Sequence, residues 1–348
     1  MTADVPRRVK PRHGREQTVL EKRAQTFEIG APLTGAVTAG DAVAAAFGDG
    51  TVHFFRPGLA PVVAQAHSGV VLCIAADGSD VLTGGDDGRF LRVSPDGSVE
   101  EIASFGTRWV DCVASGRGLY ACSSGRVVHV WSGGKKIGKG FEHPSTVGGI
   151  AFDAKGKRMA AGHYGGATVW ERGERRWKAS KFVWGGSHSA VTFSPDGKFL
   201  VSSMQENALH GWRLRDKNDI EMAGYPAKIK TFSWVGATPH LATSGADEVV
   251  CWPFDGKNGP LGRGPVCVAY GGKQIATVVQ AFPGEEAVVA GFQDGTVLLE
   301  ELDETKEAMV LRVPTGTEVA GIAVAQSRSH ILIGDVKGSV LWASLTAE

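Results

Sequence analysis

The six residues Asp294-Gly295-Thr296-Val297-Leu298-Leu299 form a tight turn that leads directly into a short apolar strand. Asp can bond its own backbone and Gly accepts a positive φ, which are the two properties that a tight turn needs. Related stretches occur along the whole sequence, with turn positions at 49, 87, 125, 165, 206, 247, 294 and 337. The chain therefore contains eight copies of one turn-and-strand unit, spaced 38 to 47 residues apart.

A repeat of about 40 residues predicts one supersecondary unit used many times. In the fifth copy, apolar runs at 190–193, 199–202 and 209–212 are separated by turns, the first of which is Ser194-Pro195-Asp196-Gly197. A weaker fourth run follows each copy, for example 59–63 in the first and 177–182 in the fourth. Four short strands per unit are typical of a propeller blade. We therefore predict an all-β fold, a single closed propeller of four-stranded antiparallel blades.

The two ends of the sequence predict how the ring closes. The eighth unit ends just after its third strand at 340–343, and the segment 19–29 has enough apolar residues to form a strand. We expect this N-terminal strand to complete the last blade, which removes exposed sheet edges. Eight blades are favoured and seven are the alternative. The Gly-rich segment 257–264 in the longest interval is predicted to be an extended loop.

Composition excludes several classes of protein. The 348 residues are 43% hydrophobic and 21% charged, with 37 Lys and Arg against 37 Asp and Glu. This balance gives no global basic field, so no nucleic-acid partner is expected. The five cysteines show no CxxC spacing, which disfavours disulfides and zinc and favours a reducing compartment. No run reaches the 18 apolar residues of a membrane span and no secretory signal is evident, so we expect a cytoplasmic monomer without membrane contact.

Residues 1–17 differ from the rest of the chain. They contain five basic residues, two prolines and almost no large apolar side chains. This composition is typical of a disordered tail, and the domain is predicted to span 18–348.

The repeats resemble the WD40 family over residues 18–348. In that family a His, a Ser or Thr on the second strand, a turn Asp and a Trp that ends the third strand form a hydrogen-bonded set. The resemblance implies this set only in part. The matching residues are His67, Thr83 and Asp87 in the second unit, His143 and Trp170 in the fourth, Ser202 and Trp212 in the fifth, and Thr243, Asp247 and Trp252 in the sixth. The departures are Val93 for Trp, Ala161 and Gly165 for Ser and Asp, Trp184 for His, Glu206 for Asp, and Tyr225 for His.

Residue types that could carry chemistry have structural interpretations here. His53, His129 and His210 occupy equivalent third-strand positions on non-neighbouring units, too far apart to share a metal. Asp49, Asp86, Asp87, Asp247, Asp294 and Asp335 lie at turns, where Asp bonds its own backbone. Cys73 and Cys112 lie on inner strands and are expected to be small buried side chains. We predict no catalytic, cofactor-binding or metal-binding residues.

One end of the propeller is predicted to carry a binding surface. Loops that enter the first strand and turns that join the second and third strands share this end, and three neighbouring units place aromatic, Met and Arg residues there. Such residues are enriched at binding hot spots. The predicted protein-binding residues are Arg108, Trp109, His163, Tyr164, Trp184, Met204 and Gln205.

Three functions are compatible with a propeller of this kind. The first is a non-enzymatic scaffold that binds a protein or peptide, as the resembled family mostly does, although a fold permits other functions. The alternative is a propeller enzyme or small-molecule binder that uses the central channel, for which Asp111 is the one charged residue on the inner strands at 71–74, 110–113 and 147–150. An outer-membrane assembly scaffold is disfavoured by the absence of an export signal.

Overall fold

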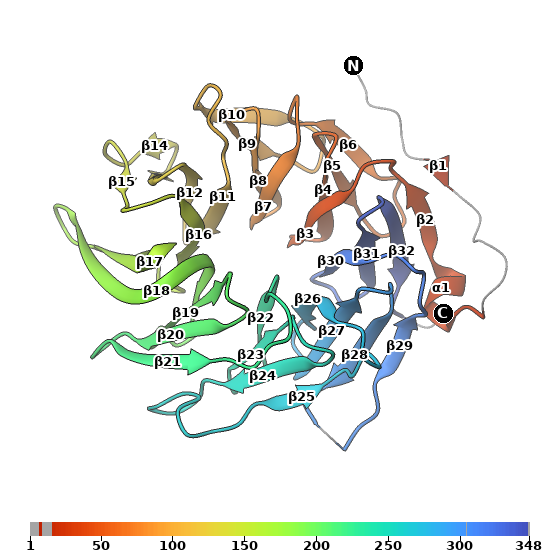
Figure 1. The fold of residues 1–348 in the computed structure, drawn as a ribbon. Coiled ribbons are helices and arrows are strands. Elements are labelled where there is room, and N and C mark those ends of the chain that lie inside the picture. The colour runs from red at the N-terminus through yellow and green to blue at the C-terminus, as the bar shows by residue number, and fades with distance from the viewer. Residues whose placement is uncertain (1–6, 9–15, 304, 347–348) are drawn as a thin grey trace.

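The computed structural model describes residues 7–8, 16–303 and 305–346, and in this part the chain is almost entirely strand and turn. The sheets are arranged around a central axis, in chain order from red to blue (Figure 1). The described strands pair antiparallel in seven continuous sheets, one of which has six strands. The predicted all-β propeller with four-stranded antiparallel blades is confirmed.

The first three units follow the predicted meander. The third differs in that two short pieces take the place of its outer strand. The strands are β3 (Leu33–Ala39), β4 (Ala42–Phe47), β5 (Thr51–Phe55) and β6 (Val62–Gln65); β7 (Val71–Asp77), β8 (Asp80–Gly85), β9 (Arg89–Val93) and β10 (Val99–Ser104); β11 (Cys112–Gly116), β12 (Leu119–Ser124), β13 (Val127–Ser132), β14 (Lys135–Lys136) and β15 (Phe141–Glu142).

The fourth and fifth units share the six-stranded sheet. Its strands are β16 (Val147–Phe152), β17 (Arg158–Arg172), β18 (Trp177–Phe193), β19 (Phe199–Met204), β20 (Leu209–Arg213) and β21 (Asn218–Met222). β17 pairs first with β16 and then, after a bulge between Tyr164 and Gly166, with β18. Likewise β18 pairs with β17 up to Ser187 and with β19 from His188 onward. Each of these two long strands therefore serves as two successive strands of the repeat.

The last three units return to separate sheets. Their strands are β22 (Phe232–Val235), β23 (His240–Thr243), β24 (Val249–Pro253) and β25 (Val266–Val268); β26 (Ala276–Ala281), β27 (Ala287–Phe292), β28 (Val297–Glu301) and β29 (Met309–Arg312); β30 (Val319–Val324), β31 (His330–Asp335) and β32 (Ser339–Ser344). No strand lies between β24 and β25, which agrees with the predicted loop at 257–264.

The segment 19–29 differs from the predicted strand because its first half is helical. α1 (Val19–Arg23) follows Thr18, whose Oγ1 accepts a hydrogen bond from the Glu21 backbone N (3.1 Å). The Glu21 carboxylate in turn accepts one from the Thr18 backbone N (2.9 Å). This capping box satisfies two N–H groups that a helix start leaves free. The spacing Thr-x-x-Glu was present in the sequence as the signal for this helix.

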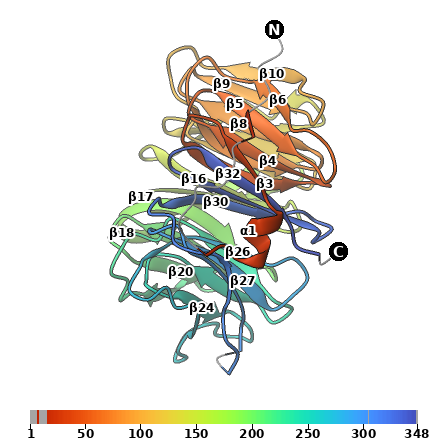
Figure 2. The same cartoon turned by 90° about the vertical axis from the view of Figure 1, so that its right-hand side faces the viewer.

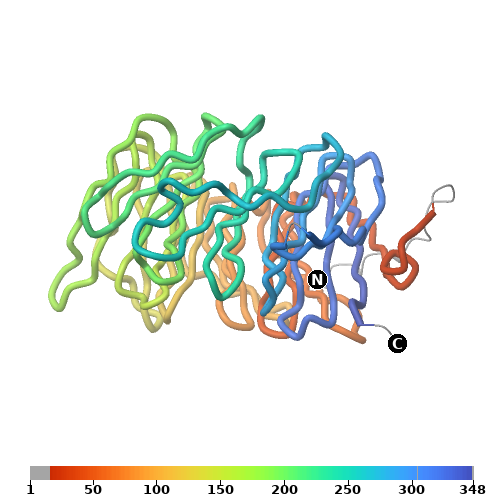
Figure 3. Tube along the Cα trace, turned by 90° about the horizontal axis from the view of Figure 1, so that it is seen from below, coloured from red at the N-terminus to blue at the C-terminus, as the bar shows by residue number. Residues whose placement is uncertain are grey.

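After the helix, β2 (Gln25–Glu28) pairs antiparallel with β32, from Gln25 opposite Trp342 to Glu28 opposite Ser339. It is the neighbour of β32 on the outer side of the sheet that contains β30, β31 and β32. Figures 2 and 3 show α1 on the rim of the molecule, beside the blue C-terminal strands. β1 (Arg7–Arg8) pairs with β2, and most of the tail predicted to be disordered, residues 1–6 and 9–15, lies outside the described residues.

Apolar side chains packed between successive sheets hold the ring together. Phe55 of the first unit packs against Phe27 of β2 (5.5 Å between ring centroids) and against Trp342 of β32 (5.8 Å). All three side chains are buried. Burial of apolar area stabilises a fold by about 25 cal/mol per Å². The contact between the first and last units therefore stabilises the ring in the same way as the contacts between other units.

Antiparallel connections alternate between the two ends of the propeller. We call one end the loop face: it carries the turns between second and third strands and the segments that enter each first strand. The opposite end carries the turns between first and second strands and between third and fourth strands. The two ends are therefore separate surfaces of the propeller.

Candidate functional site

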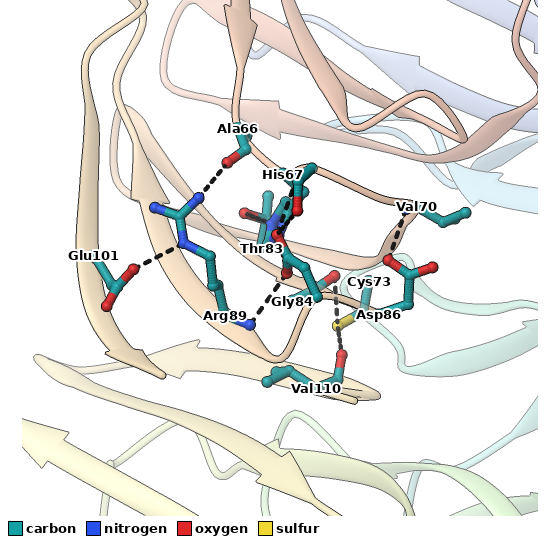
Figure 4. Close-up of polar contacts among 12 residues, drawn as sticks. Ala66, His67, Val70, Cys73, Thr83, Gly84, Asp86, Arg89, Glu101 and Val110 are labelled. Carbon is teal, nitrogen blue, oxygen red and sulfur yellow. Dashed lines mark hydrogen bonds and ion pairs between the residues drawn. The ribbon is translucent and has the colours of Figure 1, made fainter. Parts of the chain in front are cut away.

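A buried hydrogen-bond network anchors the loop face in the second unit (Figure 4). His67 Nδ1 lies 2.9 Å from Asp87 Oδ1, and His67 Nε2 lies 2.9 Å from Thr83 Oγ1. The Asp87 carboxylate also accepts hydrogen bonds from the backbone N of Ser68 and of Arg89, both at 3.1 Å. The network joins the segment entering the first strand to the second-to-third-strand turn. The predicted roles of His67, Thr83 and Asp87 are confirmed.

The surroundings of His67 and Asp87 shift the pKa of both side chains. Burial lowers the pKa of His67, and the neighbouring Asp87 carboxylate only partly offsets it. Burial by itself would raise the pKa of Asp87, but hydrogen bonds from His67, Ser68 and Arg89 lower it overall. At neutral pH the pair therefore consists of a carboxylate and a neutral imidazole whose N–H donates to it.

The fourth and sixth units use variants of this set. Trp170 Nε1 donates to His143 Nε2 at 3.0 Å. In the sixth unit the Tyr225 hydroxyl takes the place of the imidazole: it accepts from Trp252 Nε1 (2.7 Å) and lies 2.7 Å from Thr243 Oγ1. The assignment of Tyr225 to the His position is confirmed.

The fifth unit contradicts the predicted assignment of Trp184. The residue at the His position is His188, whose Nδ1 lies 2.7 Å from Ser202 Oγ. Trp184 instead stacks on His210, with ring centroids 4.0 Å apart and an interplanar angle of 15°. The spacing misled the prediction because β18 continues through a Gly185-Gly186 bend before the first strand of this unit begins.

Trp109 is the most exposed tryptophan of the loop face, and backbone hydrogen bonds hold the loop on both sides of it. Its side chain is 58% exposed. Phe105 N donates to Gly88 O (2.8 Å) and Val110 N donates to Gly85 O (3.1 Å), so the loop is tied to the turn of the second unit. Arg108 is also exposed. A large aromatic side chain on an already ordered loop loses little entropy on binding.

Tyr164 lies on the equivalent end of the fourth unit and is 68% exposed. Its backbone N donates to Ser145 Oγ (2.9 Å), and its carbonyl accepts from His163 Nδ1 (2.9 Å). The turn that follows contains Gly165 at φ +85°, which a side chain would disfavour. The phenol ring is thus presented to solvent by an ordered turn.

Two of the predicted contact residues are not on the surface. His163 is buried, with Nε2 2.9 Å from Thr168 Oγ1, so it braces the hairpin instead of facing a partner. Met204 is also buried, because the last residue of β19 pairs with His188 in the sheet interior. Gln205 is exposed and Trp184 is half-buried. The predicted set therefore loses His163 and Met204.

Sequence reasoning missed Val183, whose side chain is 75% exposed. It precedes Trp184 at the loop-face end of the fourth unit and pairs in register with Gly166. The alternation of a β-strand was the available signal: Phe182 is buried, so the next residue points the other way. Tyr270 is a further exposed aromatic residue, in the segment that enters the seventh unit.

A cavity of about 490 Å³ lies on the loop face at the fifth unit. It is lined in part by Trp184, Met204, Glu206, His210 and Tyr225. His210 is fully buried, and within the described residues neither of its ring nitrogens has a hydrogen-bond partner. Burial, followed by repulsion from His188, lowers the pKa of His210 to about 4. The ring is therefore neutral at pH 7 and contributes mainly by stacking.

The other candidate groups have structural roles. Backbone N–H groups two residues on donate to the carboxylates of Asp49, Asp87, Asp294 and Asp335, as turn chemistry predicts. Burial raises the pKa of the Cys112 thiol to about 11 and that of Cys73 well above its usual value. Burial also lowers the pKa of His53 and of His129 to about 4. Among the described residues, no three His, Cys, Asp or Glu side chains are grouped so as to hold a metal ion.

No protein-family model and no curated protein matches the sequence. Solved structures do match over most of the chain. The computationally designed Ika8 protein has a TM-score of 0.72 at 17% identity, covering 91% of this chain and 98% of that one. The C-terminal WD40 domain of Sif2 has a TM-score of 0.71 at 14% identity, covering 92% of this chain and 99% of that one. The fold is a WD40-type β-propeller.

The WD40-type fold accounts for the residues that brace the loop face, since the His, Ser or Thr, Asp and Trp contacts described above are those that the resemblance implied. At these identities the likeness shows the fold alone. In the part of the chain that the structure describes, no helix has the length and apolar character needed to cross a bilayer.

Proposed function

We propose that this protein is a non-enzymatic interaction scaffold that binds a protein or peptide on the loop face of its third, fourth and fifth units. The binding patch is defined as Arg108, Trp109, Tyr164, Val183, Trp184 and Gln205. The observation that carries the proposal is that Trp109, in a loop, and Tyr164 and Val183, in the strands β17 and β18, are each more than half exposed on two neighbouring units. Large exposed apolar side chains of this kind mark interaction sites, and Trp and Tyr dominate binding energies.

The chemistry of the patch indicates the type of partner. Its exposed groups are aromatic and aliphatic with one guanidinium and one amide, and the neighbouring Glu206 carboxylate is also exposed. Such a surface suits a segment with one or two large apolar side chains and a few hydrogen-bonding groups. The rigid loops favour binding without a change in the backbone.

The test is the double variant Trp109→Ala with Tyr164→Ala, compared with the wild type in quantitative affinity purification from the native host. Truncation of two hot-spot residues costs about 2 kcal/mol each, so capture of the specific partner should fall more than tenfold. Because both side chains are exposed, the melting temperature should change by only a few degrees.

A matched control is Leu59→Ala, which removes another largely exposed apolar side chain (57%) at the opposite end of the propeller. Its captured proteins should equal those of the wild type. Unchanged capture by the double variant, or equal loss in the control, would contradict the proposed patch.

We also propose that the ring is counted as eight blades and that β2 closes it. Two observations support the count: each sequence unit has four strand segments once β17 and β18 are divided where their partners change, and β2 adds the fourth strand to β30, β31 and β32. Deleting residues 18–30 should unfold or aggregate the protein, whereas deleting residues 1–12 should not. Equal tolerance of both deletions would refute closure, and an experimental structure in which β18 keeps one partner throughout would refute the count.

A further inference from the structure

A second cavity lies at the end of the propeller opposite to the loop face, between the fourth and fifth units. It has a volume of about 570 Å³. Its floor is apolar and includes Val169, Phe182 and Leu214. Its rim is mostly basic, with Lys198, Arg215 and Lys257, and includes one carboxylate, that of Glu171. We call it the basic cleft. Ligand pockets commonly have this size and this combination of an apolar lining with a few polar groups.

Charge along the sequence is concentrated around the basic cleft. Residues 153–217 contain 12 Lys and Arg against six Asp and Glu, a net charge of +6. The whole chain is balanced at 37 of each sign, so the remainder carries −6. The neutral total therefore conceals a basic sector, and this sector comprises the fourth and fifth units.

Some of the basic residues build the walls of the cleft. Arg158 Nε donates to Asp153 Oδ2 (2.8 Å) and its Nη2 donates to Gly197 O (2.8 Å), which ties the fourth unit to the fifth. Arg213 Nε donates to Asp216 Oδ1 (2.9 Å), and its Nη1 donates to Asn258 Oδ1 (2.7 Å). The second contact holds the start of the 257–264 loop beside the cleft.

The cations of the rim are held less firmly than Arg158 and Arg213. Lys198 is paired with Asp196 at 2.8 Å, but its side chain is 58% exposed. The Arg215 guanidinium lies 3.4 Å from an Asp216 oxygen that Arg213 also contacts, and its side chain is 52% exposed. Exposed pairs of this kind contribute about 0–1 kcal/mol and exchange partners readily. The rim can therefore turn toward an incoming carboxylate.

We propose that the basic cleft binds an acidic segment of a partner protein that carries a bulky apolar side chain. The apolar side chain would pack on Val169, Phe182 and Leu214, and the flanking Asp or Glu residues would meet Lys198, Arg215 and Lys257. Complementary charge steers the encounter and selects the partner, while the apolar floor supplies burial. A nucleic-acid strand fits less well, because Phe182 is the one aromatic side chain that lines the cleft, whereas single-strand sites stack successive bases on several aromatic rings.

The basic cleft and the loop-face patch lie at opposite ends of the same strands. This inference therefore does not depend on the proposed function of the loop face, and either can fail while the other holds. If both hold, the propeller joins two partners across its thickness.

The test uses fluorescence anisotropy with a labelled twelve-residue peptide that alternates Glu with Leu and contains one Phe. Three probes of equal length accompany it: the peptide with Lys in place of Glu, the peptide with Ser in place of Leu and Phe, and oligothymidylate. The Glu/Leu peptide should saturate the wild-type protein and bind at least tenfold more tightly than each of the others. Absence of saturation at about 1 mM, or equal binding of the oligothymidylate, overturns the proposal.

The variant pair is Arg215→Glu with Lys257→Glu, which reverses two rim charges. Its matched control, Lys135→Glu with Lys139→Glu, makes the same change in charge at exposed positions of the third unit. The rim variant should weaken peptide binding at least tenfold and the control less than twofold. Equal weakening in both would show a general charge effect and would overturn the cleft assignment.

A measurement on the wild type alone guards against misfolded variants. The peptide should slow hydrogen exchange of the backbone amides at residues 180–182 of β18, where Ser180 and Phe182 line the cleft, and leave those around Trp109 unchanged. Unchanged exchange at 180–182 under saturating peptide would overturn the proposal.

Discussion

In the second and fifth units, different side-chain contacts hold the segment that enters the first strand against the second strand. In the second unit, both ring nitrogens of His67 are bonded, one to Asp87 and one to Thr83. In the fifth, both ring nitrogens of His188 are also bonded, one to Ser202 Oγ and one to the Trp184 backbone O, but neither to a carboxylate, and the neighbouring His210 stacks on Trp184. The first arrangement is a polar network with a carboxylate at its histidine, whereas the second adds an aromatic stack to a histidine that has only uncharged partners.

The way in which each unit is braced affects the path of the segment that enters it on the loop face. A polar network requires every member, because a buried group that loses its partner is costly. Aromatic packing tolerates more variation in the path of the chain. In the fifth unit this permits the entry segment to bend at Gly185-Gly186 and to present Val183 to solvent. In both units a carboxylate of the turn holds the last part of the entry segment: Asp87 accepts from the Ser68 backbone N (3.1 Å), and Glu206 accepts from the Ser187 backbone N (3.2 Å).

Acidification should have the largest effect on stability, and it distinguishes the two units. Burial lowers the pKa of His53, His129, His143 and His210 to about 4. Between about pH 4 and 6.5 the unfolded chain therefore binds more protons at these histidines than the folded chain does. Stability is present above pH 6.5 and is lost as pH falls toward 4, by up to about 1.4 kcal/mol per pH unit for each group.

Urea unfolding at several pH values measures this loss. His210→Phe should flatten the dependence between pH 6.5 and 4, because it removes one of the four groups. His67 has a carboxylate partner that opposes the shift, so its unit should contribute less to the slope. A free energy of unfolding that stays constant from pH 7 to 5 would contradict the proposed protonation states.

A matched pair of substitutions compares the units directly. His67→Ala should destabilise the protein by about 2–4 kcal/mol, because it leaves the fully buried Thr83 hydroxyl and the Asp87 carboxylate without this partner. His210→Phe should change stability by less than about 1 kcal/mol, since Phe can keep the stack on Trp184 and the imidazole it replaces has no hydrogen bond within the described residues.

The free energies of unfolding of both variants at pH 7.5 provide the readout. At this pH neither histidine is charged, so the comparison reports bonding and packing alone. Equal destabilisation by the two substitutions would show that the fifth unit depends on polar contacts at His210 as much as the second does at His67.

Local sequence features predicted most of the fold. Asp-Gly turns at regular spacing and short apolar runs predicted the strands because turn chemistry and alternation act over a few residues. The helix at 19–23 was missed although Thr18 and Glu21 form a recognisable capping box, because the apolar content of 19–29 favoured a strand. The Gly-rich segment 257–264 was recognised as a loop, but its contact with Arg213 depends on residues about 45 positions away.

The candidate surface was predicted less well, for a physical reason. Trp109 and Tyr164 were identified because they lie in turns, which are exposed in any propeller. His163 and Met204 lie next to exposed residues in the same turns but point inward, and Trp184 was assigned to the place that His188 occupies. One residue of shift reverses the side on which a strand residue points, so the path of each loop decides exposure.

By itself, then, the sequence determined the repeat, the strand class and the turns, since each depends on neighbouring residues. Only the tertiary structure decided which histidine braces the fifth unit, which large apolar side chains remain in solvent, and which basic residues of 153–217 line an apolar cleft. Those features arise where strands from different units meet, and packing between units is set by contacts that no single stretch of the chain contains.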